Sequence, residues 1–190
     1  MVPRHAKNRM RANRKRLLVF CSFISIFFAG PARLLAADSP DATPPPSSPI
    51  PQSADGSVTL PARLAVVHGT TIRYEPQPHK NTIGYWTKAK DWVSWDFQIL
   101  KPGKFDVELW QACGKGSGGS AYTVTFGEQT LADTMPETGP SFTNWVRRTL
   151  GTVNLGNSGR YTVEVKALKK PGLAVMDLRE IKLSPHADSK

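Results

Sequence analysis

The chain has 190 residues and a formal net charge of +10, with 25 Lys and Arg residues against 15 Asp and Glu residues. Residues 1–37 hold eight of the basic residues and none of the acidic ones, so the remainder has 17 basic against 15 acidic residues, a net charge of +2. A strongly basic domain is typical of nucleic-acid binding, but here the excess lies in the first segment. We therefore expect no nucleic-acid partner for the domain.

Residues 1–37 have the pattern of a signal peptide. A basic stretch precedes the apolar run LLVFCSFISIFFAG at residues 17–30, which is too short for a comfortable transmembrane helix. Small residues at Ala36 and Ala37 favour cleavage before Asp38, although Leu35 fits the cleavage pattern less well. An uncleaved signal anchor is the alternative. We expect a secreted or periplasmic protein with no membrane span after signal cleavage.

Residues 38–59 are rich in Pro, Ser, Asp and Ala and poor in large apolar residues. Such a segment cannot bury enough surface to fold, so we predict a disordered linker there. Residues 60–185 form one domain, and residues 186–190 form a tail. Within the domain Cys113 has no partner for a disulfide, and a lone thiol among hydrophobic residues is most often a small buried core residue.

The domain contains short runs in which apolar residues recur at a period of two, separated by Gly, Pro, Asn and Asp. This pattern is typical of half-buried antiparallel strands. The expected strands lie at residues 64–69, 71–75, 92–99, 104–113, 120–127, 129–135, 145–155, 160–168 and 174–183. Strands of this number and length predict an all-β fold, an antiparallel β-sandwich of the jelly-roll type.

The alternation also assigns faces to individual residues. Trp95 shares its phase with apolar neighbours and is expected in the core, whereas Trp110 shares its phase with acidic residues and is expected on an outer face. In the last strand the apolar phase changes along the run, which a β-bulge near Arg179 or Glu180 would explain. Partial burial of both faces is the alternative.

The sequence shows no catalytic constellation. No Cys or His pair has the spacing of a zinc site, and no serine has the context of a nucleophile. Paired carboxylates for glycoside cleavage depend on spatial rather than sequence spacing, so an enzyme stays a minor alternative.

Aromatic residues near strand ends give the strongest indication of a binding site. Sugar rings present flat C–H faces that pack on aromatic rings, and Tyr85, Trp86, Trp92 and Trp145 fall near strand ends or in connections. Packing in the core or at its rim is the competing interpretation. Lys115, in the glycine-rich connection 114–119, is placed to reach an anionic ligand, although a purely structural connection is the simpler interpretation.

The longest continuous patterns are IGYWTKAKDWVSWDFQILKPGKFDVELWQACGKGSGGSAYTVTFG and NWVRRTLGTVNLGNSGRYTVEVKALKKPGLAVMDLREIKL. They resemble the galactose-binding-like β-sandwich modules of the family 6 and family 35 carbohydrate-binding type. They are also similar to the C-terminal accessory domain of many secreted bacterial sulfatases. The resemblance covers residues 66–183.

The resemblance implies a polysaccharide or oligosaccharide ligand at the loops of one sandwich edge. The matching loop residues are His79, Lys80, Asn81, Tyr85, Trp86, Trp92, Asn144, Trp145 and Arg147. It also implies a structural calcium ion, for which Glu75 and Asp177 stand nearest the expected positions, and no other cofactor. The sulfatase catalytic portion is missing from the sequence.

Three functions follow as hypotheses. The first is a secreted, non-catalytic carbohydrate-binding module, whose ligand is a neutral or a sulfated or otherwise anionic polysaccharide. The second is a domain that docks an exported protein partner or the cell envelope, which a large apolar face around Trp110 would favour. The third is a glycan-active enzyme, which two carboxylates facing each other across a cleft would favour.

Overall fold

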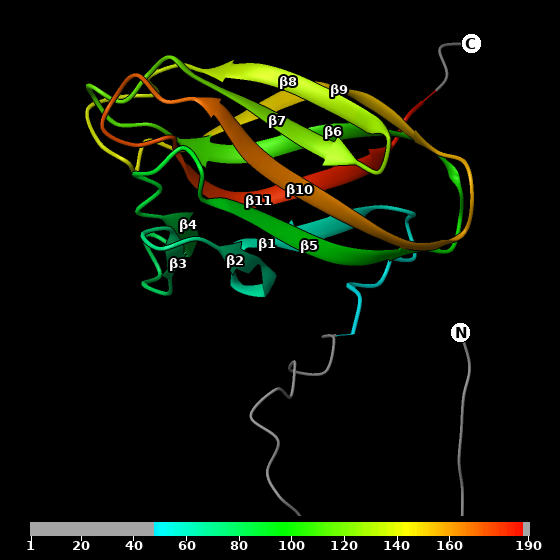
Figure 1. The fold of residues 1–190 in the computed structure, drawn as a ribbon. Helices are drawn as coiled ribbons and strands as arrows, with labels where there is room; N and C mark the ends of the chain where they lie inside the picture. Colours follow the sequence, from blue (N-terminus) through cyan, green and yellow to red (C-terminus); the bar gives the residue numbers. More distant parts are fainter. Residues whose placement is uncertain (1–47, 188–190) are drawn as a thin grey trace, which may run out of the picture. The chain divides into compact units, whose positions relative to one another are not determined.

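The alternating runs form two antiparallel sheets that pack face to face (Figure 1). The computed structural model describes residues 48–187, so the predicted signal peptide, most of the linker and the last three residues lie outside the described residues. Eleven strands and one short 3-10 helix, η1 (Ala62–Leu64), make up the described part. Its fold is the all-β sandwich that the sequence predicts.

The first sheet has six strands in the order β3-β4-β11-β6-β9, and β1 also pairs with β11. The second has five strands in the order β2-β5-β10-β7-β8. The strands of the first sheet are β1 (Val58–Pro61), β3 (Arg73–Glu75), β4 (Thr82–Gly84), β6 (Gly103–Ala112), β9 (Val146–Leu155) and β11 (Asp177–Pro185). Those of the second are β2 (Val66–His68), β5 (Trp92–Ile99), β7 (Ser120–Phe126), β8 (Gln129–Met135) and β10 (Gly159–Lys169).

The core lies between the sheets and takes one face of each long strand, because successive side chains of a strand point to opposite sides. Trp95 and Phe97 of β5 are fully buried, as are Val107 and Leu109 of β6. Trp110 lies on the outer side, where it is half-buried. The predicted orientations of both tryptophans are confirmed.

The phase change in the last strand is a register shift between Leu178 and Glu180, where β11 pairs with β6. The bulge predicted near Arg179 or Glu180 is therefore confirmed. An extra residue in one strand lets β11 keep its apolar side chains inward on both sides of the shift. Leu178 before the bulge and Ile181 after it are both fully buried.

The connections that follow β6, β8 and β10 gather at one end of the sandwich, at the left of Figure 1, together with the short strands β3 and β4. The turn between β5 and β6 lies at the other end. Neither β4 nor β1 was expected, because strands of three or four residues are too short to show a period.

The expected boundary between linker and domain at residue 60 lies too late in the chain. Val58 and Leu60 of β1 are fully buried, and Ile50 forms a parallel bridge with Phe97. The buried Gln52 side chain accepts hydrogen bonds from the backbone N–H groups of Leu100 and Lys101, each at 2.8 Å. One polar side chain thus joins a proline-rich segment to the β5–β6 turn, which composition alone does not reveal.

The predicted tail also begins later than expected. The His186 backbone N–H donates to the Lys104 carbonyl at 2.9 Å, so residue 186 is still attached to the domain. The helical part of residues 48–187 amounts to the three residues of η1, and none of it has the length or hydropathy of a transmembrane span.

The Gln52→Ala variant tests whether residues 48–57 belong to the folded unit. Loss of the amide removes the acceptor of two backbone N–H groups, so we expect the free energy of unfolding to fall by about 1–2 kcal/mol. Urea unfolding followed by tryptophan fluorescence measures the difference. The exposed neighbour Ser53→Ala is the control, and equal stability of the two variants would contradict the assignment.

Candidate functional site

A pocket of about 330 Å³ opens at the loop end of the sandwich, beside the hairpin formed by β3 and β4. We call it the loop-edge pocket. Its residues come from the β3–β4 hairpin, the β4–β5 connection, the β8–β9 connection and the segment leading into β11. They are Glu75, Lys80, Tyr85, Thr87, Phe142, Leu173, Ala174 and Asp177.

Tyr85 supplies an exposed aromatic ring to the pocket. Its side chain is 49% exposed, and the Arg73 guanidinium lies 3.5 Å from the centre of its ring. Arg73 covers one face of the ring, which leaves the other face for contact with a ligand. The backbone φ of Tyr85 is 54°, an unfavourable value for a bulky residue. Such backbone strain costs about 1–3 kcal/mol and is concentrated at functional sites.

Trp86 corrects the sequence-based expectation, because its indole is fully buried and offers no face to a ligand. Its Nε1 donates to the Asp91 carbonyl at 2.8 Å, and its own carbonyl accepts from the Val175 N–H at 2.9 Å. Trp86 therefore fixes the β4–β5 connection to the segment that precedes β11. The position of the outward-facing Tyr85 ring therefore depends on the buried Trp86 next to it.

The buried Asp91 side chain organises the neighbouring loop. Its Oδ2 accepts from the N–H and hydroxyl of Thr71, each at 2.9 Å, and from the N–H of Ile72 at 3.2 Å. Burial acts to raise the pKa of Asp91, but these hydrogen bonds outweigh it and hold the pKa below its ordinary value. Thr71 also accepts a hydrogen bond from Thr87 of the pocket, at 3.0 Å.

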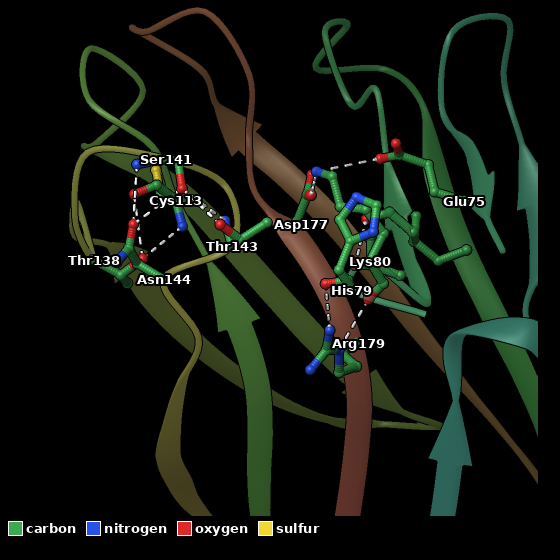
Figure 2. Close-up of polar contacts among 12 residues, drawn as sticks. Glu75, His79, Lys80, Cys113, Thr138, Ser141, Thr143, Asn144, Asp177 and Arg179 are labelled. Carbon is green, nitrogen blue, oxygen red and sulfur yellow. Dashed lines mark hydrogen bonds and ion pairs between the residues drawn. The ribbon is translucent and has the colours of Figure 1, made fainter. Parts of the chain in front are cut away.

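Three charged side chains that line the loop-edge pocket contact one another (Figure 2), and we call them the pocket floor. The Lys80 Nζ lies 2.5 Å from Oδ2 of Asp177 and 3.7 Å from Oε2 of Glu75. Burial raises the pKa of Asp177 to about 6, and the charge of Glu75 also raises it, whereas the hydrogen bond and charge of Lys80 lower it. Gly84 makes room for this group, because a Cβ there would lie 1.9 Å from Glu75 Oε2.

The expected structural calcium ion does not fit this arrangement. Glu75 and Asp177 do come together as the resemblance implies, but the Lys80 ammonium lies between them. Calcium takes six to eight oxygen ligands, and residues 48–187 contain no cluster of three or more Asp, Glu, His or Cys side chains suited to a metal ion. As placed here, Glu75 and Asp177 therefore do not fit a calcium ion, because the Lys80 ammonium already bridges them.

Trp92 lies away from the pocket, on the outer face of the second sheet. Its ring stacks on His68 with the ring centres 3.6 Å apart, and the Lys166 Nζ lies 4.3 Å from its ring centre. Trp92 thus packs against residues of the two strands that flank β5, His68 of β2 and Lys166 of β10. The structure does not bring it together with Tyr85 in one site.

Trp145 and Arg147 lie on the outer face of the first sheet, around Trp110. The two indole centres are 6.4 Å apart, and the Arg147 and Arg179 guanidinium groups lie 4.5 and 4.6 Å from the centre of the Trp110 ring. Arg147 also pairs with Glu108 at 2.8 Å. The structure therefore does not bring Trp86, Trp92 and Trp145 together in one cleft.

Of the remaining expected residues, only Lys80 lines the loop-edge pocket. His79 and Lys80 accept hydrogen bonds from Arg179 through their backbone carbonyls, at 2.8 and 2.9 Å (Figure 2). Asn81, with φ 45°, accepts from the Tyr74 hydroxyl at 2.7 Å. Lys115 is exposed and lines a separate shallow hollow next to Glu137.

Cys113 is fully buried, as expected for a core residue. Burial raises the pKa of its thiol to about 11, so the reactive thiolate is scarce at neutral pH. Its backbone N–H donates to the Thr138 hydroxyl at 2.8 Å, which fixes the start of the β8–β9 connection.

Sequence reasoning missed Phe142, Leu173 and Thr87 as pocket residues. Phe142 and Leu173 lie in connections far apart in the sequence and meet only through the fold. The sequence does offer a sign that Leu173 is a candidate binding residue, because it is a lone large apolar residue after Pro171-Gly172. In the structure its side chain is 72% exposed. Phe142 stands likewise between Ser141 and Thr143.

Solved structures with a similar fold include carbohydrate-binding modules. A family 35 module from Clostridium thermocellum matches with a TM-score of 0.56 and 14% identity, over 68% of this chain and 98% of that one. A family 6 module from Cellvibrio mixtus lichenase 5A, solved with cellotriose, matches with a TM-score of 0.52 and 22% identity, over 68% and 97%. The domain therefore shares the β-sandwich fold of these modules.

A third match is the GH26-CBM35 β-(1,4)-mannanase of Podospora anserina, with a TM-score of 0.55 and 18% identity. It involves 72% of this chain but only 29% of the mannanase chain. By sequence, the chain belongs to a family described as a domain of unknown function, DUF5077, whose profile matches residues 68–188. No curated protein matches the chain significantly.

The raised pKa of Asp177 predicts a pH dependence. The folded protein binds this proton more tightly than the unfolded chain, in which the pKa is near the ordinary value of 3.8. The contribution of Asp177 to stability is therefore fully present below about pH 4 and is lost as the pH rises through about 6.

Carboxyl ¹³C NMR titration measures the pKa of Asp177 directly. We expect a transition near pH 6 in the wild-type protein that is absent in Asp177→Asn. In urea unfolding between pH 4 and 6, Asp177→Asn should lack the corresponding decline in stability. An Asp177 transition below pH 4 would contradict the prediction.

Proposed function

We propose that this domain is an exported, non-catalytic carbohydrate-binding module that binds a neutral saccharide in the loop-edge pocket. The observation that carries the proposal is the exposed Tyr85 ring, held on a backbone with positive φ, beside buried acceptor groups in one open pocket. The similar modules of known structure, one of them solved with cellotriose, support a saccharide as the ligand class.

The pocket combines the two kinds of contact that sugars require. Tyr85 and Leu173 are 49% and 72% exposed and provide apolar surface for the C–H faces of a sugar ring. Glu75, Asp177 and the Lys80 ammonium provide acceptors and donors for hydroxyl groups at the pocket floor. A shallow pocket of about 330 Å³ predicts weak binding, roughly millimolar to micromolar.

The charges favour a neutral ligand over the sulfated or otherwise anionic one that the sequence left open. Two arginines near the first sheet, Arg147 and Arg148, are already paired with carboxylates: Arg147 with Glu108 and Glu180, and Arg148 with Asp133. The pocket floor carries two carboxylates against one ammonium group. An anionic group placed there would meet a carboxylate within the same pocket.

Docking to an exported protein has less support. That hypothesis called for a large apolar face around Trp110 and no aromatic pocket at the loop edge. Instead, Arg147 and Arg179 both lie against the Trp110 ring, and an exposed aromatic side chain lines the loop-edge pocket. The face around Trp110 is thus largely covered by the protein's own charged side chains.

Glycan cleavage is the other alternative, because Glu75 and Asp177 share one pocket. Glycosidases use two carboxyl groups that flank the scissile bond, one of them free to donate a proton. Here both carboxylates contact the same lysine, and the Asp177 side chain is only 5% exposed. This geometry favours binding over catalysis.

Affinity electrophoresis tests the proposal with β-mannan, laminarin and hydroxyethylcellulose as neutral polysaccharides and carrageenan as a sulfated one. We expect at least one neutral polysaccharide to retard the protein. Retardation by none of the four, or by carrageenan alone, would overturn the proposal. Release of reducing ends from any of them would contradict a non-catalytic role.

Substitutions in the pocket locate the site. With any polysaccharide that retards the wild-type protein, Tyr85→Asn and Leu173→Asn should weaken the affinity at least about tenfold, a change of about 1.4 kcal/mol. Asn tolerates positive φ, so Tyr85→Asn removes the ring without opposing the backbone. The matched control is Leu100→Asn, an exposed leucine in the β5–β6 turn at the other end of the sandwich.

Leu100→Asn should bind as the wild-type protein does. Equal losses in Leu173→Asn and Leu100→Asn would place the ligand outside the loop-edge pocket. Thermal unfolding of each variant shows whether a loss of affinity comes from the site or from the fold.

A further inference from the structure

The edge hairpin of the first sheet has little strand pairing to hold it in place. Strands β3 and β4 are three residues long, and β4 pairs with β11 in register only at Ile83 and Leu178. Side-chain contacts must therefore supply much of the attachment between this hairpin and the sandwich. Two of these contacts, with Glu75 and Asp177, converge on Lys80.

We propose that the Lys80 ammonium is a built-in counter-ion that joins β3 to β11, so that this edge of the sandwich requires no bound divalent cation. Lys80 Nζ contacts Glu75 at the end of β3 and Asp177 at the start of β11. It thus connects two strands that do not pair with each other directly.

The three side chains are largely shielded from solvent, so their charges affect the stability of the fold. They are 19%, 13% and 5% exposed for Lys80, Glu75 and Asp177. Ion pairs on an open surface contribute little, whereas removal of one partner from a buried pair leaves an uncompensated charge and is strongly destabilising. The loss of Lys80 would leave two carboxylates close together without a cation.

The backbone holds Lys80 in place independently of its ion pairs. Its N–H donates to the Gln77 carbonyl at 2.8 Å within the hairpin turn, and its carbonyl accepts from Arg179 Nε at 2.9 Å. Arg179 lies at the bulge in β11. The lysine is therefore fixed at both ends, by its backbone and by the carboxylates.

The lack of a side chain at Gly84 completes the arrangement. A Cβ at this position would lie 1.9 Å from Glu75 Oε2 and 3.1 Å from Asp177 Oδ1, so both carboxylates pass close to the Gly84 backbone. A cation that bridged the same two carboxylates would compete for their oxygens with the Lys80 ammonium and be repelled by it.

Thermal unfolding tests the proposal in wild type, Lys80→Met, Asp177→Asn, Lys80→Met/Asp177→Asn and Lys80→Arg. The wild-type midpoint should be the same in 1 mM EDTA and in 5 mM CaCl₂. Met keeps most of the apolar stem of the lysine, so Lys80→Met removes mainly the charge. We expect its midpoint to fall by roughly 10 °C, and that of Lys80→Arg to stay near the wild-type value.

The double variant separates a counter-ion from a packing residue. If Lys80 neutralises buried charge, Asp177→Asn should restore much of the midpoint lost in Lys80→Met, because the uncompensated carboxylate is then gone. This comparison stands even if Lys80→Met fails to fold, since the double variant should fold. A double variant no more stable than Lys80→Met would overturn the proposal, and so would a wild-type midpoint that falls in EDTA or rises in calcium. None of these measurements depends on a saccharide ligand.

Discussion

Burial of Trp86 is the constraint on which the loop end of the sandwich depends. Its indole fills the core while its backbone and ring nitrogen join the β4–β5 connection to Asp91 and to the segment before β11. These two hydrogen bonds hold the connection that carries Tyr85 against the segment that carries Leu173, and both residues line the loop-edge pocket. Long strands determine the architecture, but one buried side chain in a connection determines whether the pocket exists.

The floor of the pocket has a different physical basis. Two carboxylates and one ammonium group are held together in partly dry surroundings, an arrangement that is costly unless every charge has a partner. The same three groups present hydrogen-bond donors and acceptors to the pocket. Attachment of the edge hairpin and recognition of a polar ligand would therefore use the same atoms, so a change in one would alter the other.

The sequence predicted the sandwich well because its long strands alternate cleanly, and even the bulge in β11 was visible as a change of phase. Prediction from the sequence failed where it depended on local backbone geometry or on contacts between residues far apart in the chain. Tyr85 and Trp86 are adjacent, yet one side chain is half exposed and the other fully buried, a difference that composition does not reveal. Glu75 and Asp177 were correctly paired, yet the cation between them comes from a turn residue whose position depends on the hairpin. Phe142 and Leu173 meet only in space.

The attachment of residues 50–52 has a consequence for how the domain would be presented. Ile50 and Gln52 join the sandwich near Phe97 and Lys101, and the His186 backbone bonds to Lys104, all at the end where β5 turns into β6. Both the entering and the leaving segments of the domain therefore meet it at the end opposite the loop-edge pocket. A domain tethered or immobilised through either segment would keep its pocket directed away from the point of attachment.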